Sequence, residues 1–480
     1  MGEGLEPGHD KASNMTDTLL KAYHSLPAPL RSVVASLRGL YLRRWRYGSG
    51  TERLVEEALA RESWTVNQWK VWQEERLAYV LHRAATQVPY YREQWNVRRR
   101  RGDRASWEYL ENWPTLEKDS VRDNPRAFVA DDCDPRRMFH ERTSGTSGKP
   151  MNLWWSVNTV RQWYALSEAR CRHWNGVSRH DHWLMIGGQL VIPVRQRTPP
   201  FWVWNKGLNQ LYLSSYHLSQ SFYRYYAEAI AQYAPTHAMG YPSSLATLAQ
   251  AVLESGQEDL KMAVVITNAE PLYDFQRTVI ARAFGCPVRE TYGMAEIVVA
   301  ASECAASRLH LWPEVGWVEV MECNESLPGD ATGDLVCTGL LNADMPLIRY
   351  KVGDRGGVSV SPQDCSCGRA LPQISRIEGR SNDVLLAPDG RRVFWLNPVF
   401  YGLPVREAQI IQDAFDKLRV RYVPAPGFSS QTEHSIIERL YARMGKVEVG
   451  MERVDAVPRG PNGKFRAVIS NLSKQDREYS

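Results

Sequence analysis

Residues 143–150 combine the residue types that bind phosphate. They read Thr-Ser-Gly-Thr-Ser-Gly-Lys-Pro, so four hydroxyl residues, two glycines and a lysine share eight positions. Glycine lets the backbone come close to a ligand, and hydroxyl and N–H groups can then converge on phosphate oxygens. A Walker A loop needs four residues between its glycines and a Ser or Thr after the lysine, whereas Thr146 and Ser147 alone intervene here and Pro150 follows. The stretch therefore predicts a different phosphate-binding loop, formed by Thr143, Ser144, Gly145, Thr146 and Ser147. A flexible Ser/Gly linker is the alternative.

A second group of residues could bind a metal ion. Cys365 and Cys367 form a Cys-x-Cys pair, and Cys304 and His310 lie earlier in the chain. Three thiolates and one imidazole are the ligands of a closed tetrahedral Zn²⁺ site, which would be structural. Buried free cysteines are the alternative, because Cys-x-Cys is a weaker pattern than Cys-x₂-Cys.

Composition narrows the class of protein. A chain of 480 residues has room for two or three domains. The net charge of +5 is too small to argue for nucleic-acid binding. No apolar run approaches the roughly 18 residues of a membrane span, so membrane association is not expected. Eight cysteines without a secretory signal are typical of reduced thiols and predict a cytoplasmic protein.

The N-terminal part is predicted to be helical after a disordered leader at residues 1–16. Residues 17–46 predict two helical pieces, of which the second, residues 30–46, is basic and amphipathic. We expect its apolar side to pack on its own domain, with a membrane surface as the alternative. Residues 65–85 predict another helix. The four consecutive arginines at 98–101 predict a solvated loop, with a polyanion-binding site as the alternative.

The middle of the chain alternates apolar runs with helical patterns. Strands are predicted at residues 181–186, 238–241, 262–267 and 288–291, and helices at residues 219–233, 243–256 and 272–284. This rhythm indicates a mostly parallel α/β sheet, in which ligands bind beyond the carboxyl ends of the strands. Residues 240–242, 268–270 and 292–293 fall there. Short strands at about residues 305–378 predict a β subdomain, and residues 381–480 predict a small α+β domain.

The order of the motifs resembles that of the adenylate-forming superfamily of acyl-CoA synthetases. After the glycine loop come Asn-Ala-Glu-Pro at 268–271, Glu-Thr-Tyr-Gly-Met-Ala-Glu at 290–296, Arg-Tyr-Lys-Val-Gly-Asp at 349–354, Gly-Arg at 379–380 and Gly-Pro-Asn-Gly-Lys at 460–464. Residues 46–48, 88–91, 240–243 and 463–466 resemble the phenylacetate–CoA ligase branch, and most closely its members from polysaccharide and natural-product gene clusters. The resemblance begins near residue 17. It implies a large α/β domain at residues 17–380 and a mobile lid domain at residues 381–480.

The resemblance implies that ATP and Mg²⁺ are cofactors and assigns roles to single residues. Tyr292 would stack on adenine, Asp354 would accept the ribose hydroxyls, Arg380 would reach ribose or phosphate, and Glu296 would bind Mg²⁺. The nucleotide site would also include Ala269, Glu270, Thr291 and Gly293. A core tyrosine, a Gly-Asp turn and an exposed ion-paired glutamate are the respective alternatives for Tyr292, Asp354 and Glu296.

The resemblance also assigns the catalytic lysine and the hinge. Lys464 would bridge the carboxylate and α-phosphate oxygens during adenylation. The lid would then rotate about Asn382, a position where the family has Asp or Lys.

The implied reaction is activation of a carboxylic acid as an acyl-adenylate, followed by transfer to CoA. Transfer to an amine, a hydroxyl or a carrier protein is the first alternative, and a non-catalytic nucleotide-binding protein is the second. Tyr241 and Tyr216 favour an aromatic or apolar acid, although both could be core residues. Relatives in this branch are often dimers, so a homodimer is compatible with the resemblance.

Overall fold

The computed structural model describes most of the chain. The described residues are 19–143, 151–256, 260–324, 332–359, 365–380, 385–389, 391–393, 396, 399–400, 402–460 and 465–472. The predicted leader, residues 144–147 of the glycine loop, Asn382 and Lys464 lie outside them, as does the side chain of Arg380.

Helices form most of the first 130 residues. They are α2 (Ala28–Arg46), α3 (Thr51–Ala60), α4 (Val66–Gln87), α5 (Pro89–Arg100) and α6 (Lys118–Asp123). A reciprocal capping box between Thr65 and Gln68 starts α4, and Pro89 occupies the first position of α5. The prediction of a loop at residues 98–101 is wrong, because Arg98, Arg99 and Arg100 form the last turn of α5 and Arg101 caps it. Basic side chains there interact favourably with the carboxyl end of the helix dipole.

Helix α2 packs on the sheet through its glycine rather than through its apolar side. A Cβ on Gly39 would lie 2.0 Å from Asn205 Oδ1. A Cβ on Gly207, which follows β4 (Trp202–Asn205), would lie 2.5 Å from the backbone nitrogen of Leu40, so the helix approaches this closely where both sides have glycine. Arg31 is buried on the same helix, whereas Leu37 is 61% exposed and Val33 and Leu40 are also exposed. The prediction that the apolar side packs on its own domain is therefore wrong. Leu37 and its apolar neighbours face outward instead.

A twelve-stranded sheet runs through the large domain, in the order β11-β12-β13-β14-β10-β9-β8-β7-β6-β3-β5-β4. Its strands are β3 (Trp183–Gly187), β4 (Trp202–Asn205), β5 (Gln210–Ser214), β6 (His237–Gly240), β7 (Val264–Thr267), β8 (Val288–Gly293), β9 (Ala300–Glu303), β10 (Leu309–Leu311), β11 (Gly316–Asn324), β12 (Thr332–Gly339), β13 (Tyr350–Ser359) and β14 (Gln373–Arg380). Strands β8, β7, β6, β3 and β5 pair in parallel. The α/β fold is thus confirmed, but the sheet is mixed rather than mostly parallel, because its other neighbouring strands pair antiparallel.

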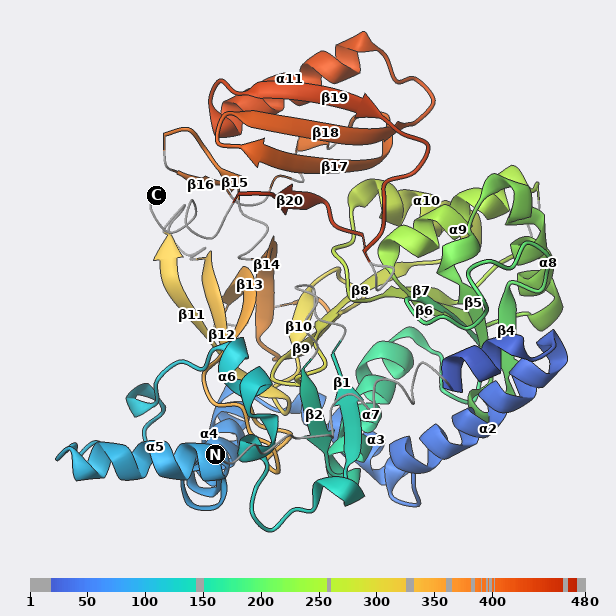
Figure 1. Cartoon of the computed structure of the whole chain (residues 1–480). Helices are drawn as coiled ribbons and strands as arrows, with labels where there is room; N and C mark the ends of the chain where they lie inside the picture. Colours follow the sequence, from blue (N-terminus) through green and yellow to red (C-terminus); the bar gives the residue numbers. More distant parts are fainter. Residues whose placement is uncertain are drawn as a thin grey trace, which may run out of the picture.

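The predicted β subdomain is continuous with the parallel strands. Strand β8 pairs antiparallel with β9, and β9, β10 and β14 continue the sheet toward β11. Figure 1 shows the sheet passing from the green parallel strands to the yellow and orange antiparallel ones. The point where the direction changes is the β8–β9 junction.

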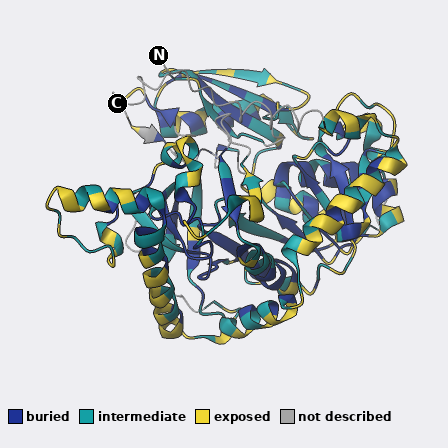
Figure 2. Ribbon diagram, turned by 60° about the horizontal axis from the view of Figure 1, so that its bottom comes forward, coloured by how far each residue is buried: buried dark blue, intermediate teal, exposed yellow. Residues whose placement is uncertain are grey.

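Helices cover the parallel strands and complete their core. They are α7 (Val157–Ser167), α8 (Tyr223–Tyr233), α9 (Pro242–Glu254) and α10 (Asp274–Phe284). Buried apolar residues of α8, α9 and α10 join those of the parallel strands in one cluster. In Figure 2 these strands are dark blue, while the outer sides of the helices are yellow. A second cluster joins α3, α4 and α5 to the antiparallel strands.

A separate C-terminal sheet lies above the large domain in Figure 1. Its order is β19-β18-β17-β20, and α11 packs on it with its own core cluster. The elements are β17 (Val405–Ala414), β18 (Lys417–Pro424), α11 (Ser430–Met444), β19 (Glu448–Arg453) and β20 (Val468–Ser470), preceded by the small hairpin of β15 (Leu385–Leu386) and β16 (Arg392–Val393).

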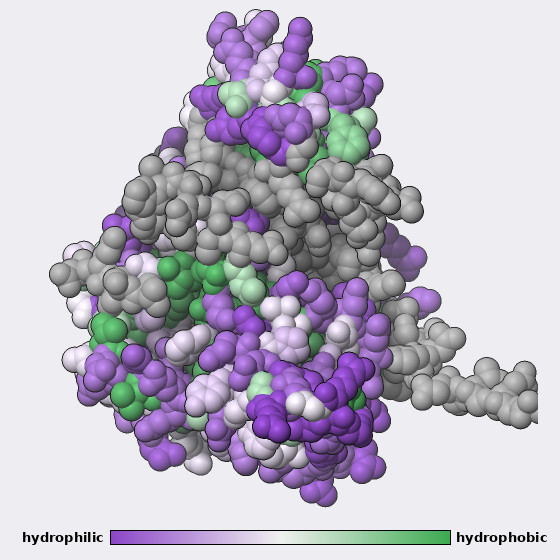
Figure 3. Space-filling view, turned by 90° about the vertical axis from the view of Figure 1, so that its left-hand side faces the viewer, coloured by the Kyte–Doolittle hydropathy of each residue, from purple (hydrophilic) through white to green (hydrophobic). Residues whose placement is uncertain are grey.

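The surface is largely hydrophilic on the face that Figure 3 shows, both on the C-terminal domain and on the helices at the opposite end. Among the described helices, none combines the length and the apolar character that crossing a membrane requires.

Candidate active site

A short hairpin presents the glycine loop. Strands β1 (Phe139–Arg142) and β2 (Asn152–Trp155) pair antiparallel, with Arg142 opposite Asn152. Beyond this pair the Thr143 N–H donates to the Met151 carbonyl, and the Met151 N–H donates to Thr143 Oγ1, both at 3.0 Å. The hairpin therefore fixes both ends of the loop, and Thr143 lines the main cleft.

The carboxyl ends of the parallel strands meet at this cleft, as expected from their order. Backbone bonds join the ends: the Tyr241 N–H donates to the Ile186 carbonyl, and the Asn268 N–H donates to the Gly240 carbonyl. The Thr291 hydroxyl donates to the Thr267 carbonyl at 2.7 Å. The cleft has a volume of about 3490 Å³, which exceeds the roughly 300–1,000 Å³ of a pocket for one drug-sized ligand. It has room for a nucleotide and a second substrate.

Tyr292 and Asp354 are brought together across the sheet. The Tyr292 hydroxyl donates to Asp354 Oδ2 at 2.9 Å, and both residues line the cleft. Asp354 pairs with Arg380 in the β13–β14 ladder, so three residues predicted to bind the nucleotide occupy neighbouring positions. Gly293 and Thr291 flank Tyr292 on β8 and also line the cleft.

Glu296 lies in the same cleft and is held by two residues that the sequence analysis did not assign. The Tyr350 hydroxyl donates to Glu296 Oε1 at 2.9 Å, and the Lys118 ammonium lies 4.0 Å from the same oxygen. Lys118 reaches this position because the Leu116 N–H donates to the Arg349 carbonyl, which places the start of α6 beside β13. Tyr350 belongs to the quoted motif at 349–354, so the motif could have identified it as a site residue. No sequence motif identifies Lys118.

Glu270 connects the two domains. Its Oε2 accepts the Ser243 N–H at 3.2 Å, and its Oε1 accepts the Phe465 N–H at 2.6 Å. Burial raises the pKa of Glu270, while the Phe465 N–H opposes that shift. Ala269 beside it has φ of 65°, a left-handed conformation that costs free energy for a non-glycine residue. The predicted nucleotide residue Glu270 thus binds a segment of the C-terminal domain.

The described residues on either side of Lys464 line the cleft. They are Gly460 and Phe465, and Arg459 lines the cleft with them. The Arg459 guanidinium lies 4.9 Å from the centre of the Phe465 ring and pairs with Glu407 of β17. The C-terminal domain therefore brings Arg459 and Phe465 to the ends of the parallel strands.

An apolar part of the cleft lies beside the ends of β3 and β6. Its walls are formed by Met185, Tyr212, Met239 and Tyr241. Tyr241 is therefore where the sequence analysis expects it. Tyr216 is not among the residues that line the cleft, and its hydroxyl donates to the Gly188 carbonyl at 2.9 Å. Tyr212, which β5 turns toward the cleft, was missed.

Glu290 lines the cleft and has an unusual pKa. Desolvation by burial raises its pKa from 4.5 to about 7, and Glu303 adds repulsion, whereas the Leu272 N–H and Arg277 act in the opposite direction. Glu303 itself is held by Arg277 at 3.1 Å and by the Glu290 N–H at 2.7 Å. The quoted motif at 290–296 contains Glu290, but a pKa shift cannot be read from a motif.

The predicted metal ligands lie together but away from this chemistry. The ligand atoms of Cys304, His310, Cys365 and Cys367 are all within 4.8 Å of one another, and none of the four residues lines the cleft.

Known proteins resemble the chain over most of its length. Residues 385–471 match the family model of the CapK C-terminal domain. The chain is 25% identical over 465 residues to protein CapK of Staphylococcus aureus, covering 94% of this chain and 99% of that protein. It is 26% identical over 434 residues to phenylacetate–coenzyme A ligase of Pseudomonas putida, covering 87% of this chain and 89% of that protein.

A solved structure shares the fold. It is 2-hydroxyisobutyryl-CoA ligase in the postadenylation state in complex with R3-HIB-AMP, with a TM-score of 0.62 and 17% identity, covering 88% of this chain and 93% of that one. These similarities agree with the order of the motifs and with the cleft at the β8–β9 junction. The chain is a phenylacetate–CoA ligase-like member of the adenylate-forming ligase superfamily.

Proposed function

We propose that this ligase activates an aromatic or apolar carboxylic acid with ATP and transfers the acyl group to CoA. The observation that carries the proposal is the convergence of Tyr292, Asp354, Glu296 and both described flanks of the Lys464 segment on one cleft. In the first step a carboxylate oxygen bonds to the α-phosphorus of ATP as the bond to pyrophosphate breaks. In the second, a thiol sulfur bonds to the acyl carbon, loses its proton, and AMP leaves.

The residues of the cleft fit a bound nucleotide. Asp354 has two acceptor oxygens for the ribose hydroxyls, and Tyr292 offers a flat ring for adenine. The side-chain oxygen of Asn268 is buried and finds no hydrogen-bond partner among the described residues. An acceptor in this position, lining the cleft, fits a ligand N–H such as the amino group of adenine.

The charges of the cleft fit Mg²⁺ and a phosphate chain. Magnesium is commonly bound by one or two carboxylates together with substrate phosphates, and Glu296 supplies one such carboxylate. When bound, the ion stabilises charge that develops on the phosphates. Lys118 would add a positive charge beside Glu296. Lys464 would contact the carboxylate and α-phosphate oxygens, and one such donor is typically worth roughly 3–4 kcal/mol in the transition state.

The class of acid follows from the walls of the pocket. Met185, Met239, Tyr212 and Tyr241 present apolar and aromatic surface, and a Cβ on Gly187 would lie 3.2 Å from both Met185 Cε and the Tyr212 hydroxyl. Gly187 therefore keeps space open at this end of the cleft. A flat or apolar acyl group fits such walls better than a charged one.

The experiment is to trap the acyl-adenylate without assuming the acceptor. The protein is incubated with ATP, Mg²⁺ and single acids from an aromatic and aliphatic panel, with hydroxylamine present to capture the activated acyl group. Acid-dependent hydroxamate and AMP are expected. CoA and amines are then compared as acceptors for the acid that reacts. ATP binding without AMP formation for every acid would instead support a non-catalytic nucleotide-binding protein.

A further inference from the structure

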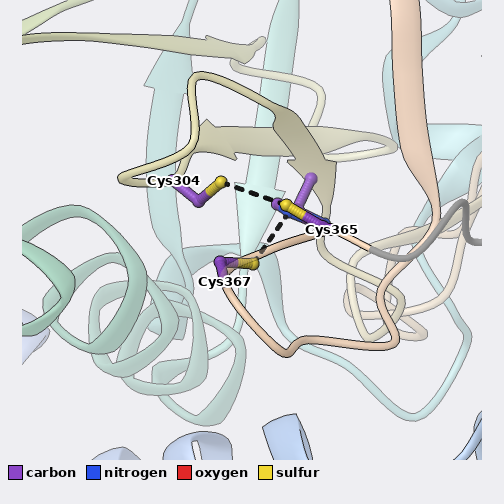
Figure 4. A group of neighbouring side chains, drawn as sticks. Cys304, Cys365 and Cys367 are labelled. Carbon is purple, nitrogen blue, oxygen red and sulfur yellow. Dashed lines mark hydrogen bonds between the residues drawn. The ribbon is translucent and has the colours of Figure 1, made fainter.

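Four potential metal ligands converge from three segments of the sheet. Cys304 directly follows β9, His310 lies in β10, and Cys365 and Cys367 precede β14. In Figure 4 the sulfur atoms of Cys304, Cys365 and Cys367 turn toward one another. Cys304 and His310 are 1% and 0% exposed, whereas Cys365 and Cys367 are half-buried.

Two distances within the cluster match tetrahedral zinc coordination, and the ligand atoms all lie within 4.8 Å of one another. Zn–S bonds of about 2.3 Å and Zn–N bonds of about 2.0–2.1 Å place neighbouring ligand atoms about 3.8 Å apart for two sulfurs and about 3.5 Å apart for sulfur and nitrogen. Cys304 Sγ and Cys365 Sγ are 3.7 Å apart, and Cys367 Sγ and His310 Nε2 are 3.4 Å apart. A disulfide would require about 2.05 Å between the sulfurs. We propose that Cys304, His310, Cys365 and Cys367 form a closed structural zinc site.

The imidazole is oriented for coordination. His310 Nδ1 lies 3.2 Å from the Leu371 carbonyl, a contact that places the ring proton on Nδ1. The lone pair of Nε2 then points at the cluster. Metal-binding histidines usually donate their other N–H to such a carbonyl, which fixes the tautomer and the plane of the ring.

A nearby cation balances the charge of the site. Zinc with three thiolates has a net charge of −1, and Arg369 hydrogen-bonds Cys367. The Arg369 guanidinium also pairs with Glu62 at 2.8 Å and lies 4.1 Å from the centre of the Trp174 ring. The Trp174 and His310 rings meet edge to face, with their centres 6.2 Å apart. Charged and aromatic side chains thus contact the ligands, as the hydrogen-bonding partners of metal ligands do in known sites.

The zinc site would fix strands that carry residues predicted to bind the nucleotide. Ala301 of β9 pairs with Tyr292, and β14 ends at Gly379 and Arg380, opposite β13. One ion would join β9, β10 and the entry to β14. Four protein ligands leave no coordination position for a substrate, so the metal would act on stability rather than on the reaction.

The test measures metal content and does not rest on the proposed function. Wild-type protein produced in zinc-supplemented medium and purified without chelators is compared with Cys365→Ser and with Cys133→Ser, a half-buried cysteine outside the cluster. We expect about one zinc per chain in the wild type and in Cys133→Ser, as a closed four-ligand site requires, and far less in Cys365→Ser.

Measurements on the wild type keep the test decisive if Cys365→Ser fails to fold. A thiol-modifying reagent should release the metal, which a zinc-sensitive dye would detect. The unfolding temperature of the protein should fall as the zinc is lost. Wild-type protein with little zinc, or with a Cys304–Cys365 disulfide in its intact mass, would overturn the proposal. Equal zinc in the wild type and in folded Cys365→Ser would do the same.

Discussion

Glu270 offers a direct test of how the C-terminal domain engages the cleft. Its carboxylate accepts one N–H from Ser243 in the large domain and one from Phe465 in the C-terminal domain, and it is 8% exposed. A glutamine amide has one acceptor oxygen and one donor group, so Glu270→Gln can satisfy only one of the two N–H groups. Glu270→Ala satisfies neither.

The expected loss of adenylation follows from the type of hydrogen bond that is removed. A hydrogen bond to a charged group contributes about 1.5–3 kcal/mol. Loss of the bond to Phe465 would therefore weaken docking of the Lys464 segment by about 10-fold to 150-fold, since about 1.4 kcal/mol corresponds to tenfold. The proposed adenylation step uses Lys464 in the cleft, so adenylation should fall by a similar factor in Glu270→Ala, and by less in Glu270→Gln.

The assay separates the two half-reactions. Formation of acyl-adenylate is compared with acyl transfer from supplied acyl-adenylate, in which the lid is proposed to rotate away. Glu254→Gln is the matched control, because Glu254 forms a partly exposed ion pair with Arg406 of β17 at 3.8 Å. Such pairs contribute up to about 1 kcal/mol, so the control should lose no more than about fivefold. An equal loss of both half-reactions in Glu270→Ala, or a control as damaged as Glu270→Ala, would refute the docking role.

Three further outcomes are expected. Asp354→Ala should raise the KM for ATP by about 10-fold to 100-fold, because it removes a charged acceptor. Tyr292→Phe removes one neutral donor to Asp354 and should change this KM by less than about tenfold. Steady-state kinetics at varied ATP concentration would show this order. Tyr350→Phe should lower kcat several-fold and raise the Mg²⁺ concentration needed, because Glu296 loses its hydroxyl donor; a magnesium titration of the variant would show it. Glu290 has a raised pKa of about 7 in the folded chain, so the folded state binds the extra proton between about pH 4.5 and 7, and stability should fall as pH rises through that window. Glu290→Gln should flatten this part of a urea-denaturation profile against pH, and an unchanged slope would contradict the assignment.

The sequence predicts the elements that local pattern controls. The strand β7 could be predicted because a strand buried on both faces has a continuous apolar run. The end of α10 could be predicted because a left-handed residue after a helix is usually glycine, here Gly285. Strands β9 and β10 are only four and three residues long, and their pairing depends on distant parts of the chain. The outward-facing apolar side of α2 was missed because close packing at Gly39 is a tertiary effect.

In the candidate site, too, the sequence predicts what motifs identify and misses what depends on contacts between distant residues. Motif order placed Tyr292, Asp354 and Glu296 in one cleft, since each follows or lies on a strand whose position the fold fixes. The contact between Glu270 and Phe465 could not be predicted, because it joins two domains and 195 positions of chain. Tyr212 replaced Tyr216 as a wall of the pocket because the first lies within β5 and the second follows its end.

The central claim is that this cleft forms an acyl-adenylate. The measurement that tests it most directly is ATP–pyrophosphate exchange with the reactive acid, in the wild type and in Lys464→Ala. We expect acid-dependent exchange in the wild type and its near-complete loss in Lys464→Ala, with acyl transfer from supplied acyl-adenylate largely retained by the variant. Exchange that continues unchanged in Lys464→Ala, or exchange that does not depend on an acid, would contradict the account.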